Sequence, residues 1–199
     1  MNLFLDLEVK FHTDDKGRTD PSPYIASNYL VSAGYIFDNE LLNYYFFKHN
    51  DLPALNSCTA SGKSLKAYLD NTTLLIAHNA KFELSWLKAC GFKYDGKIAC
   101  TQIREYVLAR GQKFSLKLAD ICIREHLQHK KTDLVDKYLR QGIGFEAMPW
   151  EIVQEYGIGD VESLRELYYN QIDRLNAAPH LWPTVNLMEE FCRCLVDIE

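Results

Sequence analysis

The N-terminal segment, residues 2–9, constrains the fold more than any other stretch, because it places two acids within an apolar strand. Its apolar residues are typical of a strand that is buried on both faces. Asp6 and Glu8 interrupt it, and side chains two residues apart on a strand project from one face, roughly 6–7 Å apart. Two unpaired carboxylates there repel each other and resist burial unless a divalent cation lies between them. The segment therefore indicates either a metal-binding strand or an edge strand whose polar face meets water.

Composition sets the broad class of protein. With 199 residues the chain suits one domain, with room for a short appendage, and 47% apolar and 25% charged residues are ordinary for a soluble globular protein. The net charge of −5 neither indicates nor excludes a nucleic-acid partner, because bound cations and a local basic face can override it. Six cysteines form no CxxC pair, so we expect them to be reduced packing residues of an intracellular protein.

No apolar run approaches membrane-spanning length, and the N-terminus enters a strand at once. We therefore expect no signal peptide, no membrane partner and a cytoplasmic location, which for a viral protein would be the host cytoplasm.

The expected elements indicate an α/β domain with a mixed sheet. After the first strand, residues 10–28 are rich in turn formers and should be an exposed loop. Further strands are expected over 29–37, 42–47, 73–77 and 97–100, the first two forming an antiparallel hairpin that pairs with the N-terminal strand. Helices are expected over 61–69, 80–90, 101–110, 115–126, 132–140 and 149–175, with Pro149 in the first turn of the last. Residues 176–199 form a linker and an amphipathic helix whose apolar face has no obvious partner in residues 1–175.

Two further motifs join the acidic strand as candidates for chemistry. One is His78-Asn79-Ala80-Lys81-Phe82-Glu83, at the turn from a buried strand into a helix. The other is Tyr156-Gly157-Ile158-Gly159-Asp160, in which the tyrosine and the last acid lie on one helical face. Two glycines within a helix lower its stability by roughly 1 kcal/mol each relative to alanine, which indicates that another group approaches the helix backbone closely there. Taken singly, these motifs also fit an ordinary helix start and a solvated helix face.

Taken together and in this order, the three motifs resemble the DnaQ-like, or DEDD, 3′–5′ exonucleases. Tyr156, four residues before the last acid, resembles the tyrosine that distinguishes the DEDDy subgroup. The resemblance of the chain is strongest to the proofreading domain of bacteriophage-type family-A DNA polymerases. It covers residues 1–175 and includes the stretches 100–106 and 115–119. It implies a ribonuclease H-like α/β fold: a mixed five-stranded sheet, three antiparallel strands then two parallel, flanked by helices.

The resemblance also implies roles for five residues and a cofactor of two divalent cations, Mg²⁺, with Mn²⁺ able to substitute. Asp6 bridges the two ions, while Glu8 and Asp160 complete the site of the nucleophilic water. Glu83 supports the second ion, and Tyr156 orients the water, since a phenol with a pKa near 10 is a poor base. The family usually has Asp at the position of Glu83. The extra methylene moves the carboxylate by about 1–1.5 Å, so we expect activity that is weakened.

Candidate nucleic-acid contacts come from two sources. Residues 104–131 hold seven basic and three acidic residues, which indicates either a face that follows phosphates or a solvated helix surface. Stacking on terminal bases suits Leu7 and Phe11, although Leu7 fits the core equally well. Asn79 either holds the substrate end or braces the metal ligands. The candidates are Leu7, Phe11, Asn79, Arg104, Lys113, Lys117 and Lys131.

The function that the resemblance implies is a 3′–5′ exodeoxyribonuclease that hydrolyses phosphodiester bonds at the 3′ end of single-stranded DNA and proofreads for a DNA polymerase. Residues 187–199 resemble the helix that connects such exonuclease domains to a polymerase domain. Residues 176–199 then begin that connection, or they cap a free-standing nuclease. The alternatives in function are an RNA 3′-trimming exoribonuclease and a catalytically weak nucleic-acid-binding or docking module of a polymerase.

Overall fold

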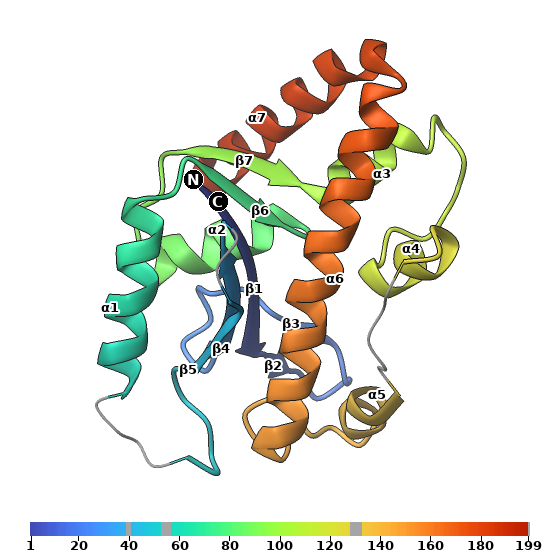
Figure 1. Ribbon diagram of the computed structural model, residues 1–199. Helices are drawn as coiled ribbons and strands as arrows, with labels where there is room; N and C mark the ends of the chain where they lie inside the picture. Colours follow the sequence, from blue (N-terminus) through green and yellow to red (C-terminus); the bar gives the residue numbers. More distant parts are fainter. Residues whose placement is uncertain (39–40, 53–56, 128–132, 199) are drawn as a thin grey trace.

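The computed structural model describes residues 1–38, 41–52, 57–127 and 133–198, without the side chains of residues 57–63. Its centre is a mixed five-stranded sheet with the strand order β5-β4-β1-β6-β7 (Figure 1). Antiparallel pairing joins β5, β4 and β1, and parallel pairing joins β1, β6 and β7. The predicted sheet is therefore confirmed. Its strands are β1 (Asn2–Lys10), β4 (Tyr29–Phe37), β5 (Asn43–Phe46), β6 (Leu74–Ala77) and β7 (Lys97–Cys100).

Helices cover both faces of the sheet (Figure 1). The β1 side chains Leu3, Leu5 and Leu7 pack with residues of α1 (Ser57–Asp70) and α2 (Ala80–Ala89). Phe4, from the opposite face of β1, packs with Val161 and Leu164 of α6 (Trp150–Asn176). The strict alternation along β1 therefore assigns Asp6 and Glu8 to the face that α6 covers. The other helices are α3 (Thr101–Leu108), α4 (Leu118–Arg124), α5 (Asp133–Arg140), the short 3₁₀ turn η1 (Pro179–Leu181) and α7 (Trp182–Ile198).

Several elements differ from the sequence prediction, most of them by a few residues at one end. The exposed stretch after β1 contains a small hairpin of β2 (His12–Thr13) and β3 (Thr19–Asp20). Helix α4 begins at Leu118, three residues later than expected, because polar side chains hold residues 115–117 outside the helix. Pro149 is the N-cap of α6 with ψ 132°, rather than a residue of its first turn.

The prediction that the last helix lacks a partner in the domain is wrong. Helix α7 packs against α2 and α3 and lies along the edge strand β7 (Figure 1). Its buried residues are Val185, Glu189, Cys192 and Val196, which recur at helical spacing along one stripe. The predicted apolar face consisted of Val185, Leu187, Met188, Phe191 and Leu195; Val185 lies in the buried stripe, whereas Leu187 and Phe191 are exposed.

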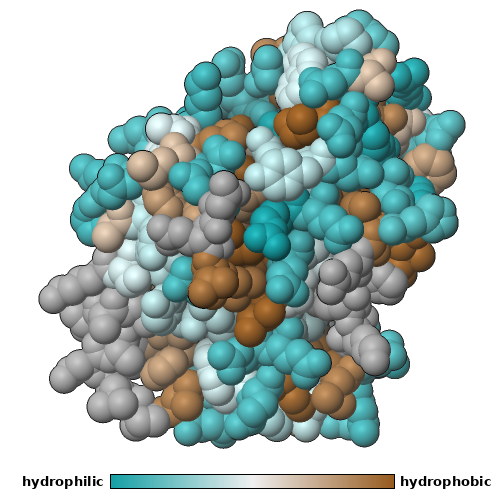
Figure 2. Space-filling view, in the orientation of Figure 1, coloured by the Kyte–Doolittle hydropathy of each residue, from teal (hydrophilic) through white to brown (hydrophobic). Residues whose placement is uncertain are grey.

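The five described cysteines are free thiols, as predicted; they are Cys90, Cys100, Cys122, Cys192 and Cys194. The side chain of Cys58 lies outside the described residues. Within the described ranges, no helix combines the length and the apolar character needed to cross a bilayer. On the face shown in Figure 2, apolar residues form several separate patches between hydrophilic ones.

Candidate active site

Three carboxylates meet where β1 passes under α6. Oxygen atoms of Asp6, Glu8 and Asp160 all lie within 4.8 Å of one another. Glu8 and Asp160 are buried, with 6% and 8% of their surface exposed, and Asp6 is half-buried. Three negative charges this close, and this poorly solvated, repel one another strongly unless protons or a cation neutralise them.

Two glycines let α6 come close enough to the sheet to bring Asp160 to β1. Gly34 lies opposite Asp6 in the pairing of β1 with β4, and a Cβ at this position would meet the side chains of Val161 and Tyr44. At Gly157 a Cβ would collide with the Tyr44 ring. The close approach that the glycines of the helix indicated is therefore confirmed at Gly157, and a tyrosine from β5 occupies the space.

Glu83 supplies a fourth carboxylate from the first turn of α2. Its side chain is 2% exposed, and its Oε2 atom has no hydrogen-bond partner among the described residues. Burial, and next the charge of Asp6, raise the pKa of Glu83 well above its ordinary value. A buried carboxylate oxygen without a donor is unusual and calls for an explanation, of which a bound ion is one.

Tyr156 lies close enough to the three carboxylates for their charges to act on its hydroxyl. Burial, followed by the charges of Asp160 and Glu8, raises the pKa of Tyr156 far above its ordinary value. The phenol therefore keeps its proton and can donate a hydrogen bond, but it cannot serve as a base near neutral pH. Its ring contacts Phe145 with centroids 5.5 Å apart, which fixes its position.

All five predicted catalytic residues line one open pocket of about 320 Å³. We call it the catalytic pocket. Its lining residues are Asp6, Leu7, Glu8, Val9, Phe11, Pro21, His78, Phe82, Glu83, Leu139, Phe145, Tyr156 and Asp160. Four carboxylates with one orphaned oxygen form the hard, oxygen-only donor set that Mg²⁺ and Mn²⁺ prefer, so the residues fit a divalent cation.

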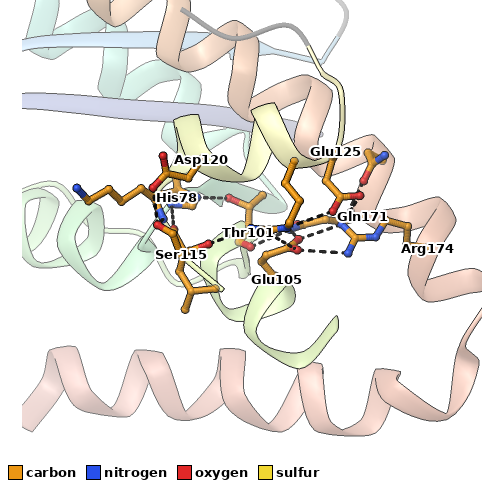
Figure 3. A network of polar contacts seen from close by, with 12 residues as sticks. His78, Thr101, Glu105, Ser115, Asp120, Glu125, Gln171 and Arg174 are labelled. Carbon is orange, nitrogen blue, oxygen red and sulfur yellow. Dashed lines mark hydrogen bonds and ion pairs between the residues drawn. The ribbon is translucent and has the colours of Figure 1, made fainter. Parts of the chain in front are cut away.

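A polar network fixes the elements that carry these side chains, and it begins at His78 (Figure 3). The Nε2 atom of His78 lies 2.9 Å from the carbonyl oxygen of Leu116 and therefore carries the hydrogen, because a carbonyl only accepts. Nδ1 then accepts from the hydroxyl of Thr101, also at 2.9 Å. His78 thus ties the turn before α2 to the start of α3 and to the segment before α4.

The network continues through the buried Glu105 to α6 (Figure 3). Gln171 of α6 donates to the carbonyl of Thr101 at 2.9 Å and to Glu105 at 3.0 Å. Arg174 and Arg124 also donate to Glu105, at 3.0 Å and 2.7 Å. Burial acts to raise the pKa of Glu105, but the bonds from Gln171 and Arg174 outweigh it and hold the pKa below its ordinary value. The network thereby fixes α6, and with it Asp160, relative to the turn that leads to Glu83.

Comparison with known proteins identifies the family. A sequence model of the 3′–5′ exonuclease family matches residues 41–174, which is more than half of the chain. The chain belongs to the 3′–5′ exonuclease family. A search of curated proteins with the sequence of this exonuclease found no match.

Solved structures of nucleases share the fold of this exonuclease. NrnC from Brucella melitensis with bound Mg²⁺ matches with a TM-score of 0.62 and 18% identity, covering 99% of this chain and 84% of NrnC. The same protein bound to pGG matches with a TM-score of 0.66 and 16% identity, covering 99% and 83%. A structure described as the apo form of a nuclease gives a TM-score of 0.70 at 16% identity, with the same coverage.

Four of the seven predicted substrate contacts border the catalytic pocket or are exposed between α3 and α4. Phe11 borders the catalytic pocket, and Leu7 borders it while packing in the core at 4% exposure. Lys113 and Lys117 are exposed on the segment between α3 and α4, next to the carbonyl of Leu116 that His78 holds. Contacts of these residues with a nucleic-acid strand remain predictions.

The three remaining candidates are Arg104, Lys131 and Asn79. The assignment of Arg104 to a phosphate-binding face is wrong, because it is 4% exposed and its Nε atom lies 2.8 Å from Glu189 in a buried ion pair. Lys131 lies outside the described residues. Asn79 is exposed in a left-handed conformation with φ 64°, and its side chain does not cap α2.

Sequence reasoning missed several residues that shape the exonuclease site. His78 lay inside a quoted motif, yet nothing in that motif indicated that it would hold Leu116. Nothing in the sequence marked Tyr44, whose hydroxyl bonds to Ser32 at 2.8 Å and donates to the carbonyl of Val153 at 3.1 Å. The contributions of Pro21 and Leu139 to the pocket carry no sequence signal, because both come from loops or helices far away along the chain.

The His78 network should make the stability of the exonuclease depend on pH. Burial lowers the pKa of His78 from 6.5 to about 4, against a smaller opposing effect of the Leu116 carbonyl. Between these values the unfolded chain binds the proton first, so stability falls as the pH falls. Denaturant unfolding in chelator should show that the parent loses up to about 2 kcal/mol more than His78→Gln between pH 7 and pH 5. Equal losses in the two proteins would contradict the neutral imidazole held between Thr101 and Leu116.

Proposed function

We propose that this chain is a metal-dependent 3′–5′ exonuclease that acts on the 3′ end of single-stranded DNA in the cytoplasm and proofreads for a DNA polymerase. The observation that carries the proposal is the meeting of four carboxylates and a protonated tyrosine in one open pocket. Membership of the 3′–5′ exonuclease family supports the direction of digestion. The preference for DNA and the role in proofreading follow from the resemblance of the three motifs to polymerase proofreading domains.

The proposed cofactor is a pair of divalent cations, Mg²⁺ or Mn²⁺. Asp6 would contact both ions, Glu8 and Asp160 would complete one site, and Glu83 would turn its orphaned Oε2 toward the other. Such ions, when bound, lower the pKa of a coordinated water and neutralise charge on the phosphoryl and leaving oxygens.

The side chains around the ligands then position the reactants. The hydroxyl of Tyr156 donates a hydrogen bond to the attacking water, because its raised pKa keeps the proton in place. Phe11 and Phe145 line the pocket with apolar surface, which lowers the local dielectric constant beside the carboxylates and strengthens the electrostatic interactions there. The His78 bond to Leu116 holds the backbone next to Lys117, and the exposed ammonium of Lys117 would meet a phosphate of the incoming strand.

An RNA 3′-trimming exoribonuclease is the second candidate. It is favoured by the shared fold with NrnC, one structure of which holds pGG. The proposed partner of the DNA-directed enzyme is a DNA polymerase domain or subunit, reached through residues 176–199. For the second candidate α7 would serve only to cap the domain, since it packs on α2 and α3.

Digestion of matched strands distinguishes these functions. Single-stranded DNA and RNA of one sequence, each labelled at the 5′ end, are incubated with the parent protein in Mg²⁺, in Mn²⁺ or in chelator. We expect the DNA to shorten one nucleotide at a time from its 3′ end in either metal, with no shortening in chelator and slower loss of RNA. Equal or faster trimming of RNA would replace the DNA assignment with the second candidate. No shortening of either strand would overturn the enzyme assignment.

A further inference from the structure

A second hollow of about 430 Å³ lies beside the catalytic pocket, between residues 20–24 and the start of α2. We call it the side groove. Pro21 and Phe82 line both the side groove and the catalytic pocket, so the two hollows adjoin along these side chains. A ligand that leaves the catalytic pocket past Phe82 enters the side groove directly.

The outer wall of the side groove is held in place by hydrogen bonds. Trp86, which is 2% exposed, donates from its indole nitrogen to the carbonyl oxygen of Pro21 at 3.1 Å. The side-chain amide of Asn28 donates to the carbonyls of Asp20 and Ser22, both at 2.8 Å. A wall fixed before the ligand arrives costs less ordering free energy on binding than a mobile one.

The lining of the side groove suits a nucleoside. Tyr24 is 56% exposed on the wall, and Phe82 lies on the floor shared with the catalytic pocket. Aromatic rings of this kind stack on bases without regard to sequence. The exposed amide of Asn79, which does not cap its helix, and the ammonium of Lys81 add polar groups for a sugar or a phosphate.

We propose that the substrate places two successive nucleosides, joined by the scissile phosphate, in the two hollows. One nucleoside lies in the catalytic pocket, and the other lies in the side groove with its base stacked on Tyr24. The inference rests on the proposed nuclease function and deepens it, because it gives the enzyme a binding site for two successive nucleosides. Tyr24 is then a substrate-positioning residue on the loop after β3, a part of the chain that carries none of the carboxylates.

The test compares Tyr24→Ala with Tyr106→Ala, a matched control on α3 whose side chain is 57% exposed and borders none of the pockets described above. The substrates are a 5′-labelled single-stranded DNA and two versions with an abasic residue at the terminal or the penultimate position. We expect Tyr24→Ala to lower kcat/KM roughly 5- to 50-fold on the intact strand, mainly through KM, because a stacked base contributes that much to binding. Tyr24→Phe should retain parental activity, and Tyr106→Ala should match the parent.

The abasic strands identify the contact. Where the missing base is the one that stacks on Tyr24, the parent and Tyr24→Ala should digest the strand at equal rates, as expected when a double-mutant cycle removes both partners. If Tyr24→Ala matches Tyr106→Ala on the intact strand, or keeps its full defect on both abasic strands, the inference is wrong.

Binding separates a failure of this inference from a failure of the proposed function. Fluorescence anisotropy in chelator measures the affinity of the same three strands for the parent and the variants without any hydrolysis. Weaker binding by Tyr24→Ala that disappears on one abasic strand supports the side groove even if the parent digests nothing. Unchanged binding by Tyr24→Ala, with active digestion by the parent, overturns the side groove and leaves the nuclease intact.

Discussion

Replacing Asp6 with asparagine should reduce the rate of 3′ nucleotide removal by roughly a thousandfold or more, in Mg²⁺ and in Mn²⁺. Its oxygen lies within 4.8 Å of oxygens from Glu8 and Asp160, and its charge acts on buried Glu83, so it is the common neighbour of the other three acids. Without metal, the same change should leave the protein as stable as the parent or stabilise it by about 1 kcal/mol, because it relieves repulsion between carboxylates. Single-turnover digestion and thermal unfolding in chelator measure the two effects.

Asp173→Asn is the matched control, since Asp173 is an exposed acid on α6, the helix that carries Asp160. It should digest DNA at the parental rate. An active Asp6→Asn protein would contradict the assignment of Asp6 as a metal ligand. An inactive Asp6→Asn protein that is also several kcal/mol less stable than the parent in chelator would contradict the repulsion between Asp6 and the neighbouring carboxylates.

Replacing Glu189 with alanine should destabilise the protein by about 3–5 kcal/mol, because it leaves the buried guanidinium of Arg104 without its charged partner. The carboxylate is 6% exposed, lies 2.8 Å from Arg104 Nε and accepts from the backbone N–H of Cys100 at 2.9 Å. For a chain of this size the loss corresponds to a fall in Tm on the order of 10 °C.

Two further variants decide whether the buried pair is the cause. Glu190→Ala removes the neighbouring exposed acid of α7 and should shift the Tm by no more than a degree or two. The double variant Arg104→Met/Glu189→Leu removes both charges and should recover most of the lost stability. A small effect of Glu189→Ala would show that α7 does not pack on α3 as described.

The sheet and the carboxylate cluster could be predicted from the sequence because local signals and chain order agree. Alternating side chains in β1 fix Asp6 and Glu8 on one face, and the four-residue spacing of Tyr156 and Asp160 fixes both on one side of a helix. What the sequence alone could not determine was which face of β1 meets α6. That follows from close packing at Gly34 and Gly157, where the absence of a Cβ leaves room for Tyr44.

Contacts between segments distant in sequence were the least predictable. Arg104 was counted with a basic face, and α7 was expected to lack a partner, for one reason: an ion pair whose members are 85 positions apart in the sequence leaves no local pattern. The same holds for Arg124, whose charge is shared with buried Glu105 instead of facing solvent. A count of charges along the chain therefore overstated the basic surface between α3 and α4.

Manganese binding, followed by electron paramagnetic resonance in the presence of single-stranded DNA, tests the assignment of the carboxylate cluster most directly. The parent should bind two Mn²⁺ ions per chain, and Asp6→Asn should lose at least one of them while Asp173→Asn keeps both. Shortening of the strand in the same samples should follow the bound metal. A parent protein that binds no Mn²⁺, or that shortens DNA equally well in chelator, would contradict a metal-dependent nuclease site at Asp6, Glu8, Glu83 and Asp160.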